Sequence, residues 1–400
     1  MLNWKPKGQV TTLLGVIFNA ILLTFYFMVV SAIWDFHTGR TIFGQPIATD
    51  FANYWTASAM ALSGNPAAPY DINKLFGLQM KIFGASSPMG VGWYYPPTFL
   101  LIVLPLALLP YLPALFTWLA STLAVESWIL FKISPTANIF WLSVFSTGNF
   151  CNFLFGQNGY LSASLLGGGL LLLDTHPVAG GLLLGMMSYK PNLALLIPLA
   201  LIAGRRWRAL LSAGASALAM VLLSFMALGY QVWIEYWKIS AVPMMLSAKI
   251  GPWSIMPTFY STVLSLGFDL VTAYTVQCLV MAIVAFLVAW AWYWEANFVL
   301  RASILTLGIL LFTPYAFIYD LAILSLPLVW LWVDGQKNGR FPGETLLLFL
   351  GWISPFFTQI IWSLRLIPER KVQITSLILL ALFFLTAAKV RKEIIATQVL

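Results

Sequence analysis

Charged residues are scarce in this chain, since only 8% of its 400 residues are Asp, Glu, Lys or Arg. Cysteine and histidine number two each, so neither a disulfide framework nor a cluster of Cys/His metal ligands is expected. The sequence also has no Walker loop, no HExxH motif and no Gly-x-Ser-x-Gly turn. An enzyme with this inventory is left with carboxylate base catalysis and cationic stabilisation of a leaving group, and we expect it to need no metal and no cofactor.

Hydrophobic residues are abundant instead, at 60% of the chain, and the mean hydropathy is +0.88. This composition predicts an all-α polytopic membrane protein, because a helix satisfies its own backbone hydrogen bonds in lipid. The net charge of +8 does not indicate a nucleic-acid partner, because the basic residues gather at the ends of apolar runs, as cytoplasmic anchors do. These clusters are Lys5/Lys7, Arg205/Arg206/Arg208, Lys337/Arg340 and Lys389/Arg391/Lys392.

The apolar segments predict a single domain over residues 1–400 with about twelve transmembrane helices and both termini in the cytoplasm. The apolar segments outnumber these crossings by one, so one of them does not cross the membrane. We favour residues 97–109 as a partly inserted helix, because prolines interrupt this segment. The alternative joins residues 177–203 into one helix, and the sequence leaves both open. Short helices broken by Pro or Gly are tolerated only beside protein or a watery cavity, so we expect them around a site.

The polar segment 35–95 follows the first apolar run and is expected to be a helical first extracytoplasmic loop. With the favoured topology, the turn at 156–159, the break at 190–191 and residues 315–320 face the same side of the membrane. A membrane protein that gathers its polar residues on one face is expected to do its chemistry there. We expect a bacterial inner (plasma) membrane protein, surrounded by lipids, with this face toward the periplasm or exterior.

Asp50 is the first candidate for chemistry. It opens a predicted amphipathic helix in which Phe51, Trp55, Ala59 and Leu62 recur at helical spacing. Such a helix is expected to lie flat on the membrane surface, with the carboxylate at the boundary between water and lipid. The alternative is that the aspartate only caps the helix.

Five other polar positions have two interpretations each. Asp71 opens a second predicted helix, residues 72–83, where capping is the simpler interpretation. Arg40 suits a phosphate, because a guanidinium donates two parallel hydrogen bonds, or it pairs with lipid phosphate. Lys190 lies between two half-helices in an apolar run, where a lysine indicates a functional site, with snorkelling as the alternative. Gln157 and Asn158 either bind sugar hydroxyls or only build their glycine-flanked turn.

Asp320 lies near the end of another apolar span, where we expect either a partner cation or a structural hydrogen bond. It belongs to a series of short motifs spread in order over residues 10–335. The motifs are Asp50-Phe-Ala-Asn-Tyr54-Trp-Thr-Ala57, Leu62-Ser-Gly64, Tyr70-Asp71, Tyr95-Pro96-Pro97, Gly156-Gln157-Asn158, Lys190-Pro191 before Arg205-Arg206-Trp207-Arg208, and Thr313-Pro314-Tyr315 before Tyr319-Asp320. In order and spacing, this series resembles glycosyltransferase family 87, whose members have the multi-span GT-C fold.

The resemblance implies an enzyme that takes a sugar, often mannose, from a polyprenyl-phosphate carrier on the extracytoplasmic side and transfers it to a glycolipid or glycan. It also implies an aspartate base in the first outer loop, a role that maps onto Asp50. Some relatives have a histidine where this chain has Tyr319-Asp320, so that contribution is absent here. The expected substrate-binding residues are Arg40, Tyr54, Asp71, Gln157, Asn158, Lys190, Tyr319 and Asp320.

Two other functions remain open from the sequence. A flippase or transporter of lipid-linked sugars would bind the same ligand without chemistry, but it would need polar groups distributed across the membrane. A scaffold subunit for envelope synthesis would use the 35–95 loop as a docking surface. The clustering of polar residues on one face favours the glycosyltransferase.

Overall fold

The computed structural model describes residues 9–84, 92–240, 256–363 and 373–398. Within these ranges the regular structure is almost entirely helical, and the only strands are the short antiparallel pair β1 (Trp34–Asp35) and β2 (Arg40–Thr41). The protein is therefore an all-α polytopic membrane protein, as predicted. The basic residues Lys5 and Lys7 lie outside the described residues.

Six helices of the described chain are long and apolar enough to cross a membrane, and the predicted total of twelve remains a prediction. One of these spans, Ile318–Asn338, is central, because 89% of it is buried, against 11% for the span Val16–Ile33. The long helices are α1 (Gln9–Ile33), α5 (Tyr111–Ile133), α12 (Trp207–Leu228), α16 (Leu270–Tyr293), α20 (Ile374–Gln398), and the central span formed by the 3-10 helix η5 (Ile318–Leu324) with α18 (Ser325–Asn338).

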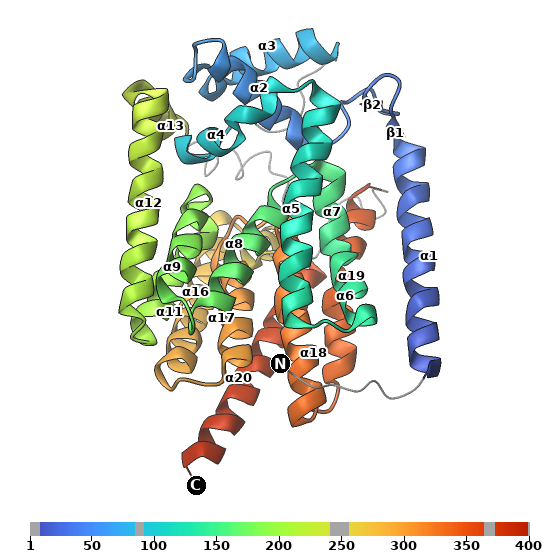
Figure 1. Cartoon of the computed structure of the whole chain (residues 1–400), viewed down its shortest axis with the longest axis vertical. Coiled ribbons are helices and arrows are strands. Elements are labelled where there is room, and N and C mark those ends of the chain that lie inside the picture. Colours follow the sequence, from blue (N-terminus) through green and yellow to red (C-terminus); the bar gives the residue numbers. More distant parts are fainter. Residues whose placement is uncertain (1–8, 85–91, 241–255, 364–372, 399–400) are drawn as a thin grey trace.

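Shorter helices complete the bundle between the long ones (Figure 1). They are α6 (Ala137–Val144), α7 (Thr147–Phe155), α8 (Gly159–Leu172), α9 (Pro177–Met186), η3 (Met187–Tyr189), α10 (Pro191–Ala194), α11 (Leu196–Ala203), α13 (Tyr230–Ser240), α15 (Phe259–Ser265), α17 (Phe298–Phe312) and α19 (Glu344–Ser363).

A layer of helices closes one end of the bundle, at the top of Figure 1. It is formed by α2 (Thr49–Leu62), η1 (Ala68–Tyr70), α3 (Ile72–Phe83), α4 (Pro97–Val103) and η2 (Leu104–Leu108). The α4–η2 segment packs against α2 instead of running the length of the bundle, in agreement with the favoured prediction for residues 97–109.

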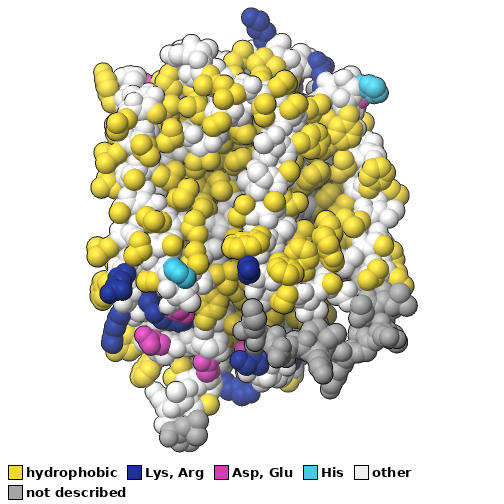
Figure 2. Space-filling view, in the orientation of Figure 1, with side chains coloured by type: hydrophobic (Ala, Val, Ile, Leu, Met, Phe, Trp, Pro, Cys, Tyr) yellow, Lys and Arg dark blue, Asp and Glu magenta, His cyan; other side chains and the backbone are white. Residues whose placement is uncertain are grey.

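The three basic clusters that the structure describes lie at the opposite end of the molecule, near the C-terminus and the α18–α19 and α11–α12 turns (Figure 1). Arg206 and Arg301 both contact Asp174 there, each at 3.0 Å. Hydrophobic side chains cover the visible flank between the two ends (Figure 2). These clusters and the helical layer of the 35–95 segment thus lie at opposite ends of the bundle, as the positive-inside rule predicts for basic anchors and an extracytoplasmic loop.

The prediction that the Asp50 helix lies flat on a membrane surface is wrong. Most of α2 is buried in protein, including Asn53, Ala57 and Met60 on the side opposite the predicted apolar stripe. Ser58 donates to the carbonyl of Val103 at 2.8 Å, so the α4–η2 segment packs directly against α2. Small residues allow this close packing of α2.

The alternative that joined residues 177–203 into one helix is also wrong. Between α9 and α11 the chain forms η3 and α10, separated at Lys190, whose backbone is not helical (φ −130°, ψ 76°). Pro191 removes a backbone donor at this point, so the break was readable from the sequence. The break brings Lys190 to the level of the turn between α7 and α8, which it contacts.

A fully buried carboxyl group ties together the helices beneath the polar end. Glu126 of α5 accepts hydrogen bonds at one oxygen from Asn149 Nδ2 (3.1 Å) and Ser325 Oγ (2.9 Å). Asn149 lies in the first turn of α7, and Ser325 begins α18. The α7 helix, which leads into the turn at 156–159, and the α18 helix, which follows η5, are thus held to the same point on α5.

Lys389 of α20 forms a second buried polar link, at the basic end. Its ammonium group contacts Asp334 Oδ2 at 2.8 Å and Glu344 Oε1 at 2.9 Å, and all three side chains are at most 5% exposed. One lysine therefore balances carboxylates of both α18 and α19 and fixes α20 against them.

We predict that Lys389→Met lowers the free energy of unfolding by about 3–5 kcal/mol, because two buried carboxylates lose their cation. Thermal unfolding of the purified protein in detergent measures the effect. The control is Lys392→Met on the same helix, where the exposed lysine forms no ion pair within the described residues and the expected change is about 0.5 kcal/mol or less. Equal melting temperatures for the two variants would contradict this prediction.

Candidate active site

Asp50 is the second residue of α2, and it does not cap the helix. The capping position is held by Ala48, in the left-handed conformation (φ 56°) and without a side-chain hydrogen bond. The Asp50 carboxylate instead accepts a hydrogen bond from Gln157 Nε2, 2.9 Å from Oδ2. The capping alternative is therefore wrong, and the first turn of α2 directs its carboxylate toward the turn between α7 and α8.

Two glycines let this turn reach α2 and η5. Gly156 has φ +66°, and a Cβ there would lie 2.6 Å from that of Phe51 on α2. A Cβ at Gly159 would meet the carbonyl of Tyr319 on η5 and, at 2.7 Å, Asn152 Oδ1. The glycine flanks of the motif are thus required by close approaches on both sides of Gln157 and Asn158.

Two tyrosines join the polar residues of the turn. The hydroxyl groups of Tyr54 and Tyr95 lie 3.1 Å apart, and both donate to Gln157 Oε1. Asn158 Nδ2 donates to each hydroxyl at 3.0 Å. Gln157 and Asn158 therefore do more than build a turn, because their side chains link α2 to the segment before α4.

Lys190 and Asp320 form a buried ion pair next to this cluster. The ammonium group contacts Asp320 Oδ1 and donates to Asn158 Oδ1 at 2.9 Å, with side chains 7% and 0% exposed for the pair. The Tyr319 ring lies 5.2 Å from the same nitrogen. Lys190 points into the protein instead of snorkelling outward. Asp320 has both the partner cation and a structural hydrogen bond, since it also accepts from the Phe317 N–H at 2.9 Å.

Asp71 and Arg40 do not join this cluster. Asp71 caps α3, since its side chain accepts from the backbone N–H groups of Asn73 (3.1 Å) and Lys74 (3.3 Å), as the simpler interpretation predicted. Arg40 lies in β2 beside Gly84, and no hydrogen bond links it to Asp50 in the described structure. The other expected site residues do lie together, and they are Asp50, Tyr54, Gln157, Asn158, Lys190, Tyr319 and Asp320.

Some members of the cluster were not singled out from the sequence. Tyr95 was quoted only as the start of a Tyr-Pro-Pro motif, and its position before two prolines was the available signal. Tyr189 precedes Lys190 and bonds Ser162 Oγ at 2.6 Å and the Asn158 carbonyl at 3.3 Å. Nothing in the local sequence distinguishes this tyrosine from an ordinary interfacial aromatic residue.

The two carboxylates of the cluster differ in their surroundings. Asp320 is fully buried against Lys190, whereas Asp50 is partly exposed and, within the described ranges, bonded only to a neutral amide. Desolvation by the surrounding protein raises the pKa of Asp50 to about 6, and the Gln157 hydrogen bond and the Lys190 charge limit the rise. Asp50 can therefore bind or release a proton near neutral pH.

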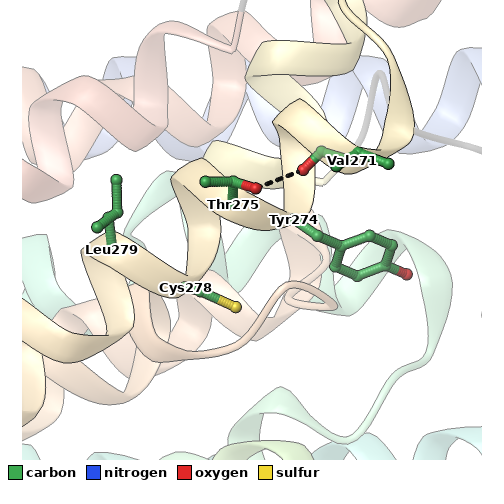
Figure 3. A pocket seen from close by; sticks show the side chains of 5 residues that line it. All are labelled: Val271, Tyr274, Thr275, Cys278 and Leu279. Carbon is green, nitrogen blue, oxygen red and sulfur yellow. Dashed lines mark hydrogen bonds between the residues drawn. The ribbon is translucent and has the colours of Figure 1, made fainter.

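A separate recess of about 510 Å³ lies on α16, away from these residues (Figure 3). Its lining is mostly apolar, with Val271, Tyr274 and Cys278 among the residues, and Thr275 Oγ1 donates to the Val271 carbonyl at 2.8 Å. It contains no acid or base suited to catalysis. In the part of the chain that the structure describes, no group of three or more His, Cys, Asp or Glu side chains could hold a metal ion.

The fold and the site define a polytopic membrane protein with a titratable carboxylate in a polar cluster at one end. The family model for glycosyltransferase family 87 matches residues 93–314, more than half of the chain. The chain belongs to glycosyltransferase family 87 and is a membrane glycosyltransferase. The matched residues include Gln157, Asn158 and Lys190, while Asp50 and Asp320 flank them. No curated protein and no solved structure matches the chain.

We predict that Gly159→Ala lowers both thermal stability and sugar transfer, because the added methyl group pushes η5 away from the turn and separates Asp320 from Lys190. Overpacking of this kind costs about 1–3 kcal/mol. The control is Gly214→Ala in α12, where a Cβ meets nothing within 4 Å. Differential scanning fluorimetry and a transfer assay should separate the two variants, and a Gly159→Ala protein as stable and active as the control would refute the requirement for glycine.

Proposed function

We propose that the protein transfers a sugar, mannose or another hexose or pentose, from a polyprenyl-phosphate carrier to a hydroxyl group of a glycolipid or glycan. The reaction takes place at the extracytoplasmic face, with Asp50 as general base and inversion at the anomeric carbon. The location of the basic clusters at the opposite end of the bundle supports this orientation, in a bacterial inner membrane.

One observation carries the assignment of the base. Of the two carboxylates in the cluster, Asp320 is neutralised by Lys190, whereas Asp50 has no cation partner at ion-pair distance among the described residues. A base must accept a proton in the transition state, and a carboxylate already paired with an ammonium group is a poor acceptor. Asp50 is partly exposed and is therefore the carboxylate that an acceptor substrate can reach.

The proposed step is a single displacement. Asp50 takes the proton of the acceptor hydroxyl, the oxygen forms a bond to the anomeric carbon, and the bond from that carbon to the phosphate oxygen breaks. The electron pair of the broken bond leaves with the polyprenyl phosphate. With one available carboxylate, no covalent sugar–enzyme intermediate is required, and inversion follows.

The leaving phosphate needs positive charge near its departing oxygen. Lys190 carries three N–H donors, of which Asn158 and Asp320 use two. We assign the remaining donor and the field of this ammonium group to the phosphate. Arg40 lies in the strand pair at the same end of the molecule but outside the cluster, so only Lys190 is assigned to the leaving phosphate.

Asp50→Asn is expected to reduce sugar transfer about 10²–10⁴-fold while leaving donor binding largely intact, because the amide cannot take the proton. The assay uses purified protein in lipid, polyprenyl-phosphate sugars and a pool of glycolipid acceptors. Asp35→Asn, a partly exposed aspartate of the same 35–95 segment that bonds His37 and Thr38 of its own turn, is the matched control and should retain activity. Full activity in Asp50→Asn would remove this residue from the role, and donor binding or translocation by the wild type without any transfer would favour the flippase.

The pH dependence of transfer follows from the raised pKa of Asp50. The base must be deprotonated, so kcat/KM should fall about tenfold per pH unit below a pKa of about 6 and level off above it. The measurement is a rate profile from pH 4.5 to 8 with the protein's melting temperature followed in parallel. A rate that stays flat down to pH 5 while the protein remains folded would argue against Asp50 as the base.

A further inference from the structure

The hydrogen bonds that lead from Lys190 to Asp50 all point the same way. Lys190 has donors only, so its Nζ donates to Asn158 Oδ1 at 2.9 Å. With this oxygen occupied, the Asn158 Nδ2 faces the hydroxyl groups of Tyr54 and Tyr95, each at 3.0 Å. The ammonium group therefore determines how the Asn158 amide is oriented.

The two tyrosine hydroxyl groups in turn determine how the Gln157 amide is oriented. Each hydroxyl group has one proton and gives it to Gln157 Oε1, at 3.1 Å in the case of Tyr95, so neither donates across the 3.1 Å between the two hydroxyls. The backbone N–H of Asn158 donates to the same oxygen at 3.2 Å. Since Oε1 is the acceptor, Nε2 must be the atom that faces Asp50, and it donates to Oδ2 at 2.9 Å. We call Lys190, Asn158, Tyr54, Tyr95 and Gln157 the relay.

Four of the five relay residues are buried, and Tyr95 is partly exposed. Tyr54 and Asn158 are 0% exposed and Gln157 is 4% exposed, whereas Asp50 is partly exposed. Among the described residues, Gln157 gives the only hydrogen bond that the Asp50 carboxyl group receives. One carboxylate oxygen, Oδ2, is thus held in place, and the other, Oδ1, has no hydrogen-bond partner in the part of the chain that the structure describes.

We propose that Gln157, Asn158 and Tyr54 are positioning residues that hold Asp50 Oδ2, so that Oδ1 takes the proton of the acceptor. This role rests on the proposed function of Asp50 as the base. Aligned hydrogen bonds polarise one another, so a run that starts at an ammonium group favours negative charge at its other end. The carboxylate form is therefore stabilised in a site whose burial alone would disfavour it.

The other groups around Asp50 leave this direction unchanged. Burial raises the pKa of Tyr54 and Tyr95, so both stay protonated and able to donate. Asp320 is already paired with Lys190. The titratable groups that interact with Asp50 are Tyr54 of α2, Tyr95 before α4, Tyr111 of α5, Tyr319 of η5 and Lys190 between η3 and α10.

Gln157→Leu tests the relay, because leucine fills a similar volume without a donor. We expect kcat to fall about 10- to 100-fold with little change in KM, as for loss of a hydrogen bond to a charged group. We also expect the acid limb of the pH–rate profile to move up by roughly one pH unit, because the lost donor favoured the carboxylate. A purely structural role would lower the rate without moving the limb.

Gln79→Leu is the matched control. Gln79 of α3 is a fully buried glutamine of the same polar end, and it donates to Asn53 of α2 at 2.7 Å without touching the relay. This variant should lose stability and keep the wild-type acid limb. If Gln157→Leu does not fold, Tyr54→Phe replaces it, with a smaller upward shift expected because Tyr95 still donates to Gln157.

The wild type and Asp50→Asn are measured in the same assay, so that the two proposals can fail separately. Loss of transfer in Asp50→Asn together with an upward shift of the acid limb in Gln157→Leu supports the relay. Loss in Asp50→Asn with an unshifted limb in Gln157→Leu overturns the relay alone. Retained transfer in Asp50→Asn overturns the proposed base, and with it the relay.

Discussion

The site depends on one electrostatic constraint, the burial of the Lys190 ammonium group among apolar helices. An unpaired charge there would be too costly, so it needs a carboxylate and an amide oxygen at hydrogen-bond distance. Asp320 and Asn158 supply them, and each is delivered by a departure from regular helix: η5 and the glycine-flanked turn. The breaks in the helices of the bundle thus lie together around the Lys190 ammonium group.

The same constraint explains which features could be predicted from the sequence. Lys190-Pro191 in an apolar run and the glycines around Gln157 and Asn158 are local signals, since each is unfavourable in an ordinary transmembrane helix. They predicted both the breaks and their common side of the membrane. Asp71 as a helix cap was equally local, because the capping hydrogen bonds reach only two and three residues ahead.

The features that could not be predicted depend on contacts between residues that are far apart in the sequence. The apolar stripe of α2 suggested a helix on the membrane surface, but periodicity reports the residues of one helix and not what covers its other face. Ser58 meets Val103, and Tyr54 meets Gln157 more than a hundred residues away. Tyrosines are so common at membrane interfaces that nothing near Tyr95 or Tyr189 marked them as members of a polar cluster.

A buried network beside a partly exposed carboxylate is a sensible arrangement for a base in an enzyme of this family. Water around a catalytic group must reorganise as charge moves, whereas groups already locked by their own partners need not. Gln157 cannot rotate its amide without breaking its contacts with both tyrosines, and these cannot turn without releasing Asn158. The orientation of Asp50 is therefore set from the Lys190–Asp320 ion pair, so the packing of the interrupted helices and the geometry of the base have the same origin.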